Sequence, residues 1–576
     1  MNQVNQMKTI VQTTLIALTT ATAFAAGGAK VIYSEIATSS TSSVPGALDA
    51  GGNPAAAQFA AMFDLVVNHD GSQWVLRCTN NLGTTLDNML ILGSGNTGSV
   101  LFQDGQPVPN TVGETFDFFD TVRPVTWDDA NRMGLSFRAK GGVTTDDEKL
   151  VIWDGTNFNI VMKQNDPYFG LIDIPTNVTG DELVGNSIGS VQLLNSGLLS
   201  LVNTPITNCS SFRYPALMHT NTAFRQSGVS PIGGSEIWDS FVLDGAGGTP
   251  DGLHWYAEGD TENTNTATDA IFVVDDNIIL QEGSLIPGTA MIYADVFHAR
   301  MLDDGQYYVR GDDSVDNDFA LRGDGMVIKT GDPITPGNTE LWGVSFANFS
   351  GNHQGDWILT GSTSSANTQA DTVLVYNGGS VLCREGDPVD VDGNGLFDDN
   401  AFINSFSPDD AHLTDSGDVF FIAGLRDTIS GTTSNLGDSM IHIEVCGSAN
   451  QYGTGCVGSG GFTPALNLTG CARAAGNVTL SVNDGLGGSF TVLMFGFGQG
   501  NVAMDGGCSL LIQTLTPAIL NLPLPGVGPG NGDLSIATQI PGNAPTVTFT
   551  MQAFVADPGV PQGFSNSNGL EVTIKG

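Results

Sequence analysis

Basic residues are scarce in this sequence. Its 576 residues include 19 Lys and Arg against 60 Asp and Glu, which gives a formal net charge of -41 at pH 7. A field of this sign repels nucleic acids and anionic membrane surfaces, so both are excluded as expected partners. Because charged residues make up only 14% of the chain, the acidity fits either cation binding or simple solubility.

Long apolar runs are missing beyond the first 25 residues. No later segment approaches the ~18 consecutive apolar residues of a membrane-spanning helix, so we expect no membrane insertion. The start of the chain differs, because Lys8, a largely apolar run over residues 9–22 and Ala-Phe-Ala at 23–25 are typical of a secretory signal peptide. We therefore predict a signal peptide at residues 1–25 and a protein that is secreted or held at the cell surface.

Cysteine is rare, with seven residues, and an exported chain is expected to oxidise those that its geometry brings together. Four cluster near the C-terminus, where proximity favours the pairs Cys446–Cys456 and Cys471–Cys508, although four cysteines can pair in three ways. We expect the other three to be small buried hydrophobic residues on or near strands: Cys78, Cys209 and Cys383.

Helical periodicity is absent, and a repeat takes its place. A degenerate phrase of two or three apolar residues, one or more polar residues, Gly or Asp and then Pro recurs at intervals of about 50–60 residues. We predict that its apolar residues form the outermost strand of a small antiparallel sheet in each repeat. The six predicted outer strands are residues 100–102, 160–162, 223–225, 278–280, 326–328 and 381–383.

A second landmark is a turn glycine that precedes an apolar strand. It occurs seven times, at Gly71, Gly134, Gly197, Gly252, Gly305, Gly355 and Gly417. Six outer strands leave one sheet incomplete, and the strand-like residues 31–35 can complete the last sheet beside residues 440–443. We therefore predict a seven-bladed β-propeller over residues 26–445, closed by an N-terminal strand that removes free sheet edges. Eight blades are the alternative if residues 59–67 form a separate element.

Residues 446–576 differ in style from the repeats. They are rich in Cys and Gly and hold alternating apolar runs at 478–482, 490–495, 547–551 and 570–574, separated by Pro/Gly turns. Several short strands of this kind predict a C-terminal β-sandwich. The predicted fold class is therefore all-β throughout.

Three motifs accompany the repeat phrase: Tyr-Gly-Thr-Gly-Cys at 452–456, Met-Gln-Ala-Phe at 551–554 and Gly-Phe-Ser-Asn-Ser-Asn-Gly at 563–569. In this combination the chain resembles exported bacterial proteins of uncharacterised function that join propeller-type repeats to a C-terminal Cys/Gly-rich β-domain. The resemblance covers nearly the whole mature chain. It implies architecture alone, because these motifs hold no catalytic residues.

The sharpest local motif is an acidic loop at residues 390–399. Its start matches the Asp-x-Asp-x-Asn-Gly opening of a calcium loop, in which alternating oxygen donors fold around a hard cation. Ala401 stands where a bidentate Glu is expected, so Asp398 or Asp399 would have to complete the shell. We predict a structural calcium site, with a solvated acidic turn as the alternative. Its predicted ligands are Asp390, Asp392, Asn394, the backbone carbonyl of Leu396 and Asp398.

Other patterns are interpreted as structural. The Gly-x-Ser-x-Gly spacing at residues 185–189 lacks the following helix that a nucleophile elbow requires. Two Arg-Gly-Asp triplets, at 310–312 and 322–324, fit strand and turn residues. Four histidines precede turn glycines and can gather near one face of a ring, although hydrogen-bonded turn residues are the expectation: His69, His298, His353 and His412.

Two functions fit this sequence, and a propeller supports either. We predict a secreted, non-enzymatic binding or scaffold protein that recognises an extracellular polysaccharide or another envelope component. The alternative is a secreted hydrolase or lyase that acts on a glycan with carboxylates at a propeller channel. Convergent carboxylates, His and Arg at one channel opening would favour the enzyme, whereas an apolar or unfocused channel would favour a binding protein.

Overall fold

The computed structural model describes residues 29–575 except 69, 120–124, 143–145, 172–181, 186–187, 205, 208–215, 220, 234–235, 395, 428–434, 474–475 and 542–543. The described residues form β-strands, three short 3-10 turns (Ser40–Ser42, Ser459–Gly461 and Asp505–Gly507) and no α-helix, as the sequence predicts. None of them forms a helix long and apolar enough to cross a membrane. The predicted signal peptide lies outside the described residues.

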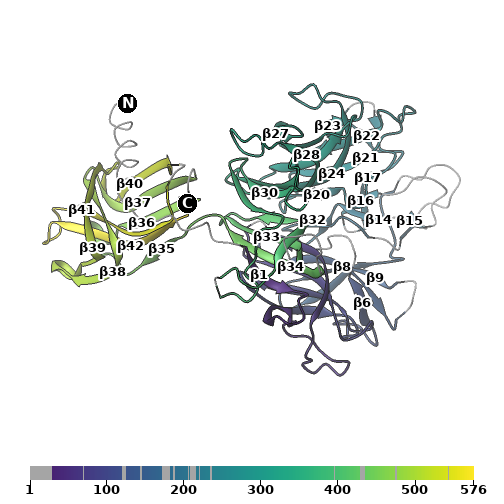
Figure 1. The fold of residues 1–576 in the computed structure, drawn as a ribbon, viewed down its shortest axis with the longest axis horizontal. Coiled ribbons are helices and arrows are strands. Elements are labelled where there is room, and N and C mark those ends of the chain that lie inside the picture. Colours follow the sequence, from purple (N-terminus) through teal and green to yellow (C-terminus); the bar gives the residue numbers. More distant parts are fainter. Residues whose placement is uncertain are drawn as a thin grey trace. The chain divides into compact units, whose positions relative to one another are not determined.

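The chain divides into two compact units (Figure 1). Among the described residues, the first unit comprises Ala29–Asp415 and Val419–Ile443, and the second comprises Ser416–Asp418 and the chain from Glu444 onward.

The first unit is a series of small antiparallel sheets whose strands mostly follow one another in sequence and in space. Four of these sheets are each built from four consecutive strands. One has β2 (Phe59–Val67), β3 (Trp74–Asn80), β4 (Asn88–Ser94) and β5 (Thr97–Gln103), and another has β20 (Ala246–Gly248), β21 (Trp255–Asp260), β22 (Ala270–Val274) and β23 (Asn277–Gln281). A third has β24 (Tyr293–Met301), β25 (Tyr307–Asp313), β26 (Asp318–Arg322) and β27 (Gly325–Lys329), and a fourth has β28 (Trp342–Gly351), β29 (Trp357–Thr363), β30 (Thr372–Tyr376) and β31 (Ser380–Arg384).

Two regions depart from this pattern. The second sheet contains β6 (Thr115–Phe119), β8 (Met133–Lys140), β9 (Glu148–Trp153) and β10 (Phe158–Lys163), with β7 (Thr126–Trp127) paired beside β8. Between β10 and β20 the described residues form three strand pairs, which are β11 (Leu183–Val184) with β15 (Ile206–Thr207), β12 (Gln192–Leu193) with β13 (Leu199–Ser200), and β18 (Pro231–Ile232) with β19 (Glu236–Ile237). They also form one three-stranded sheet of β14 (Val202–Thr204), β16 (Ala216–His219) and β17 (Thr222–Gln226).

The N-terminal strand completes the last sheet of the first unit. This sheet has the order β1 (Lys30–Ser34), β34 (Asn435–Glu444), β33 (Asp418–Arg426) and β32 (Phe402–Leu413). Val31 lies opposite Ile441 in an antiparallel pairing. The predicted partnership of residues 31–35 with residues 440–443 is therefore confirmed, and residues 59–67 belong to the first sheet as β2.

The repeat landmarks also fall where the sequence places them. Each of the six predicted outer strands is the edge strand of its sheet, within β5, β10, β17, β23, β27 and β31. Six of the seven turn glycines adopt a positive φ, as a tight turn between strands requires. The exception is Gly134, which lies within β8, and Asn131 takes the left-handed position in that turn with φ of 57°.

Side chains of the last sheet bind the backbone of the first. The Leu65 N–H of β2 donates to Asp410 Oδ1 over 2.9 Å, and His412 Nε2 donates to the Leu65 carbonyl over 2.6 Å. Tyr33 of β1 packs against Trp74 and accepts a hydrogen bond from the Gly98 N–H over 2.8 Å. One hydrophobic cluster therefore contains residues of both sheets.

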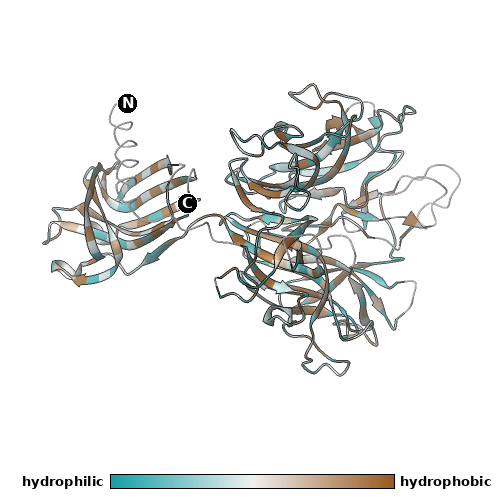
Figure 2. Ribbon diagram, in the orientation of Figure 1, coloured by the Kyte–Doolittle hydropathy of each residue, from teal (hydrophilic) through white to brown (hydrophobic). Residues whose placement is uncertain are grey.

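The second unit contains two antiparallel sheets that share one hydrophobic core. The order of the larger is β35 (Ala449–Tyr452), β42 (Phe564–Ile574), β41 (Val547–Ala556), β38 (Phe490–Ala503) and β39 (Ser509–Pro523), and that of the smaller is β36 (Ala465–Gly470), β37 (Asn477–Gly487) and β40 (Gly528–Gln539). Leu466 and Val482 of the smaller sheet and Leu493, Phe549 and Leu570 of the larger sheet belong to the same buried cluster. Hydrophobic residues are interspersed with hydrophilic ones along these strands (Figure 2).

The disulfides differ from the pairs that sequence proximity favours. Cys446 is bonded to Cys471 and Cys456 to Cys508. The first pair forms because the Gly447 N–H donates to the Ala472 carbonyl, which brings the two chain segments side by side. In the second, Asn566 accepts a hydrogen bond from Cys456 N and donates one to the Ser509 carbonyl, next to Cys508. Disulfides of this kind indicate an oxidising, non-cytoplasmic location.

The two other cysteines that the structure describes, Cys78 and Cys383, form no disulfide. Cys78 and Cys383 are free and buried, as predicted for small hydrophobic residues. Cys209 lies outside the described residues.

Candidate active site

The first unit contains a partly open cavity of about 490 Å³, which we call the polar cavity. Its wall is built from β2, β7, β12, β20, β21, β24 and β32, which belong to six different sheets of the unit. The wall carries the carboxyl groups of Asp64, Asp244, Glu258 and Asp409, the imidazoles of His298 and His412, and the guanidinium of Arg300. Acids, bases and a cation therefore line one cavity.

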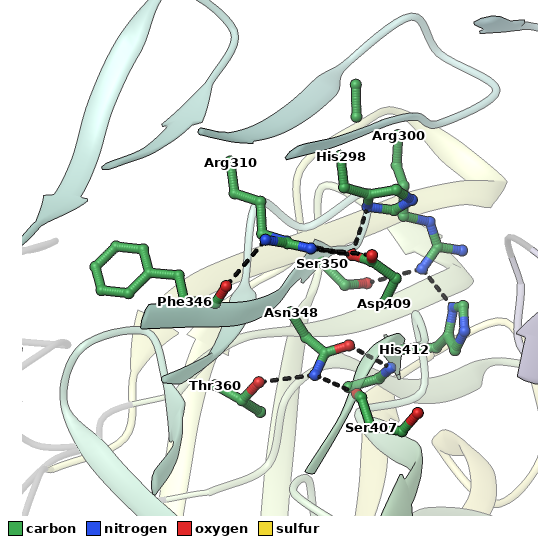
Figure 3. A network of polar contacts seen from close by, with 12 residues as sticks. His298, Arg300, Arg310, Phe346, Asn348, Ser350, Thr360, Ser407, Asp409 and His412 are labelled. Atoms are coloured by element: carbon green, nitrogen blue, oxygen red, sulfur yellow. Dashed lines mark hydrogen bonds and ion pairs between the residues drawn. The ribbon is translucent and has the colours of Figure 1, made fainter. Parts of the chain in front are cut away.

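Asp409 is fixed by a cation and an imidazole (Figure 3). Arg310 Nη2 donates to both carboxylate oxygens of Asp409, over 2.8 and 2.9 Å, and Arg310 Nη1 donates to the Phe346 carbonyl over 2.9 Å. His298 Nδ1 lies 3.3 Å from Asp409 Oδ1. Because the Arg310 side chain is only 8% exposed, this paired fork orients the carboxylate strongly.

A β-bulge in β32 presents Asp409 to the polar cavity. The register of β32 against β33 shifts between Phe406 and Ala411, and Asp409 has φ of 64° inside this irregular stretch. Asn348 stabilises the bulge from both sides, because it donates to the Ser407 carbonyl and accepts from the Ala411 N–H. A left-handed aspartate held by its neighbours is a strained feature of the kind that concentrates at functional sites.

A second pair in the wall has a supporting role. Arg300 donates to His412 Nδ1 and, over 3.3 Å, to Ser350 Oγ (Figure 3). Because His412 Nε2 donates to the Leu65 carbonyl, its Nδ1 is the unprotonated, accepting nitrogen. This tautomer makes His412 a fixed bridge between β32 and β2.

Glu258 reaches the polar cavity from β21, the second strand of its sheet. It can do so because the strand in front, β20, lies in the run Gly245-Ala246-Gly247-Gly248. A Cβ atom on Gly245 would lie 2.8 Å from the Glu258 Cβ, and one on Gly247 would lie 2.7 Å from the Tyr256 ring. The glycines therefore leave the room that both side chains need.

The environment of Glu258 favours its neutral form. The residue is only 7% exposed, and no described residue donates a hydrogen bond to its carboxyl group. Burial raises the pKa of Glu258 to about 8, and the carboxylates of Asp295 and Asp244 add to the increase, while Arg310 opposes it. Loss of hydration without compensating hydrogen bonds disfavours a carboxylate.

A row of acids lies across the neighbouring sheet. Asp295 of β24 is directly opposite Asp312 of β25, which is opposite Asp318 of β26. Burial is the largest cause that raises the pKa of Asp312 to about 6, and the negative charge of Asp295 is the second. Asp312 Oδ1 is buried without a hydrogen-bond partner among the described residues. Directly opposed like charges are unfavourable in a sheet, so this row contributes to the negative field near Glu258.

The predicted calcium loop is only partly gathered. Asp390, Asp392 and Asp399 each offer a carboxylate oxygen, and these oxygens lie within 4.8 Å of one another. Asn394 Oδ1 instead accepts a hydrogen bond from the Leu396 N–H over 2.6 Å. The third carboxylate of the group belongs to Asp399, and the predicted ligand Asp398 is not part of the group. The loop adjoins the N-terminal strand, because the Val31 N–H donates to the Asp390 carbonyl over 3.0 Å.

The four turn histidines do not form one site. His298 and His412 both line the polar cavity, whereas His353 bridges Asp415 and Asp303, with Nδ1 2.7 Å from Asp415 Oδ2. Burial lowers the pKa of His353, but the hydrogen bonds to Asp415 and Asp303 outweigh it, so the net shift is upward. His69 lies outside the described residues, as do Asn186 and Ser187 of the Gly-x-Ser-x-Gly motif.

Sequence reasoning singled out His298 but missed Asp409, Arg310 and Glu258 as site residues. Arg310 belongs to an Arg-Gly-Asp triplet, which lies in β25 as strand residues, as predicted. The available signals were Pro408-Asp409-Asp410 inside an apolar strand and the glycine run before Glu258. Neither signal indicates that the two segments face one cavity.

Comparisons with known proteins assign neither a family nor an activity. No protein-family model matches the chain, and no curated protein matches it. Among the similar solved structures, an exo-beta-1,3-galactanase from Phanerochaete chrysosporium is 12% identical over 71% of this chain and 100% of that chain, with a TM-score of 0.21. The Pyrococcus horikoshii acylaminoacyl peptidase is 10% identical over 74% of this chain and 58% of that chain, with a TM-score of 0.32. Trypanosoma rangeli sialidase is 8% identical over 95% of this chain and 96% of that chain, with a TM-score of 0.29. Scores this low carry no argument about mechanism.

Proposed function

We propose that the polar cavity is the active site of a secreted hydrolase that acts on a glycan. The observation that carries this proposal is that Asp409, His298 and the buried Glu258 line one cavity, where Arg310 holds the Asp409 carboxylate from behind. Hydrolysis of a glycosidic bond needs two carboxyl groups in different protonation states. The paired Asp409 and the desolvated Glu258 supply that asymmetry.

A glycan also fits the chemistry of the cavity wall. Sugars offer many hydroxyl groups and little charge, so they suit a concave site with several donors and acceptors. The net charge of -41 disfavours a polyanionic substrate such as nucleic acid. We therefore propose a neutral or cationic extracellular polysaccharide or envelope component as the partner.

The proposed architecture is a seven-bladed propeller closed by β1, with a C-terminal β-sandwich from residue 446 onward. The pairing of β1 with β34, the bonds of Asp410 and His412 to Leu65, and the shared cavity wall support the ring. The core common to both C-terminal sheets supports the sandwich. The two disulfides are consistent with export after cleavage of residues 1–25.

We also propose that the loop at residues 390–399 binds calcium as a structural ion. The three clustered carboxylates of Asp390, Asp392 and Asp399 support it, since Ca²⁺ prefers oxygen ligands. The ion would stabilise the region where this loop contacts β1.

A non-enzymatic binding protein is the second candidate. It is favoured by the internal hydrogen bonds that already engage Arg310 and His412, because such bonds would make both residues structural.

The two functions can be distinguished by incubating the mature protein with a panel of neutral and amino-sugar polysaccharides and analysing the soluble products by mass spectrometry. Released oligosaccharides that are absent with Asp409→Asn support the hydrolase, whereas retention of a polysaccharide without any product supports the binding protein.

A further inference from the structure

Two acids in the wall of the polar cavity are held by arginines, and Glu258 is not. Asp64 pairs with Arg77, and Asp409 pairs with Arg310. Glu258 has no ion pair and accepts no hydrogen bond from any described residue, although it is 7% exposed and lines the cavity. A buried carboxyl group with no partner in the protein is directed toward something that is not protein.

We propose that Glu258 is the proton donor that acts on the leaving oxygen of the substrate. This inference rests on the proposed glycan hydrolase. Its geometric basis is the glycine run of β20, because Gly245 and Gly247 remove the side chains that would otherwise separate β21 from the cavity. A residue of the second strand, Glu258, thereby reaches a cavity that residues of other strands mostly line.

The charges around Glu258 suit this role. The groups that act on it are the carboxylates of Asp295 and Asp244 and the guanidinium of Arg310. Two acids and strong burial outweigh one cation, so the pKa lies at about 8 and the carboxyl group is protonated at neutral pH. Arg310 is at the same time the partner of Asp409, so one cation influences both carboxyl groups.

The step balances with the groups present. Glu258 transfers its proton to the glycosidic oxygen while the bond from that oxygen to C1 breaks and its electron pair leaves with the alcohol. The Asp409 carboxylate stabilises the positive charge that develops at C1. A water molecule then adds its oxygen to C1 and returns one proton to Glu258, which restores the acid form.

The experiment compares leaving groups that do and do not need a proton. Wild type, Glu258→Gln and the exposed control Glu262→Gln are assayed on a phenyl glycoside and a 2,4-dinitrophenyl glycoside of the sugar that wild type releases from the panel. We expect E258Q to lose about 10²- to 10⁴-fold in kcat/KM on the phenyl glycoside and less than about 10-fold on the dinitrophenyl glycoside. The E262Q variant, which makes the same Glu-to-Gln change at an exposed position, should match wild type on both.

Each outcome has a separate meaning. If wild type releases no sugar from any glycan, the proposed function fails, and the role of Glu258 fails with it. If wild type is active but E258Q is unaffected, or loses equally on both glycosides, the proton-donor role is overturned while the hydrolase stands. Near-UV circular dichroism checks the fold of E258Q, and Glu258→Asp, which keeps an acid, should recover part of the activity on the phenyl glycoside.

Discussion

Arg310 and Asp409 are 99 residues apart in the sequence, yet one guanidinium nitrogen of Arg310 lies 2.8 and 2.9 Å from the two carboxylate oxygens of Asp409. They come from β25 and the bulge of β32, so the pair links two separate sheets. It fixes both the position of the carboxylate and the conformation of the bulge. Its strength can be measured directly.

A double-mutant cycle should show coupling between these residues. Removing one partner leaves the other buried without its counter-charge, so we expect Arg310→Gln and Asp409→Asn to interact by about 2 kcal/mol in the free energy of unfolding. Urea unfolding of both single variants and the double variant gives this value. Additive effects, within about 0.5 kcal/mol, would show that the fork contributes no net stability.

The stability of the protein should fall as pH rises from about 4.5 to 8, in part because of Glu258. Its pKa is raised from 4.5 to about 8 in the folded state, so the unfolded chain releases this proton first. The contribution is full below pH 4.5 and is lost as pH rises through 8, with a size on the order of 5 kcal/mol. Asp312 and Glu35, with pKa values raised to about 6 and 7, act in the same direction.

Comparison with Glu258→Gln isolates that one group. The variant cannot titrate at this position, so between pH 5 and pH 8 its free energy of unfolding should increase steadily relative to that of wild type. Thermal or urea unfolding at several pH values provides the test. Parallel pH profiles for the two proteins would contradict the raised pKa.

Calcium should stabilise the first unit. Binding to the folded state alone adds RT ln(1 + [L]/Kd), about 2.7 kcal/mol when calcium exceeds its Kd 100-fold. We expect calcium to raise the melting temperature and EDTA to lower it. Asp399→Asn should abolish the response, whereas Asp398→Asn, outside the carboxylate cluster, should retain it. An equal response in both variants would place calcium elsewhere.

Tyr33 should be an important contact of the N-terminal strand. Tyr33→Phe removes only the hydroxyl that the Gly98 N–H binds and should cost about 1 kcal/mol. Tyr33→Ala also removes the packing against Phe59 and Trp74 and should cost about 3–5 kcal/mol. Differential scanning calorimetry distinguishes the two. A small effect of Tyr33→Ala would mean that β1 contributes little to the unit.

Peptide mapping without reduction should find the two disulfides of the second unit, Cys446–Cys471 and Cys456–Cys508. Their loops of 25 and 52 residues predict a loss of about 3–4 kcal/mol for each bridge removed. The double variant Cys456→Ala/Cys508→Ala, followed by urea unfolding, measures the second. Peptides that join Cys446 to Cys456 would contradict the structure.

Much of the fold was predictable because each repeat carries its own local signals. The apolar phrase marks an edge strand and the glycine marks a turn, and the surplus turn identified residues 31–35 as a partner for β34. The disulfides were not predictable from proximity, because Asn566 and Ala472 bring together segments that the sequence separates. Strand pairing, rather than chain distance, decides which cysteines meet.

The site was harder to predict than the scaffold for a similar reason. Glu258 and Asp409 both look like ordinary strand residues in an acidic chain. Their role depends on a bulge that turns one residue and on missing side chains in front of the other. Such features arise from three-dimensional packing, so composition and spacing alone do not indicate them.

The pairing of β1 with β34 has a consequence for how the protein matures. Ribosomes make β1 first and its partner near the end of the first unit, so this contact has a very large sequence separation and is expected to form late. A prematurely terminated chain would keep an unsatisfied strand with exposed backbone groups, which invites aggregation or proteolysis. Finished molecules, in which β34 covers this strand, should therefore resist proteolysis better than incomplete ones.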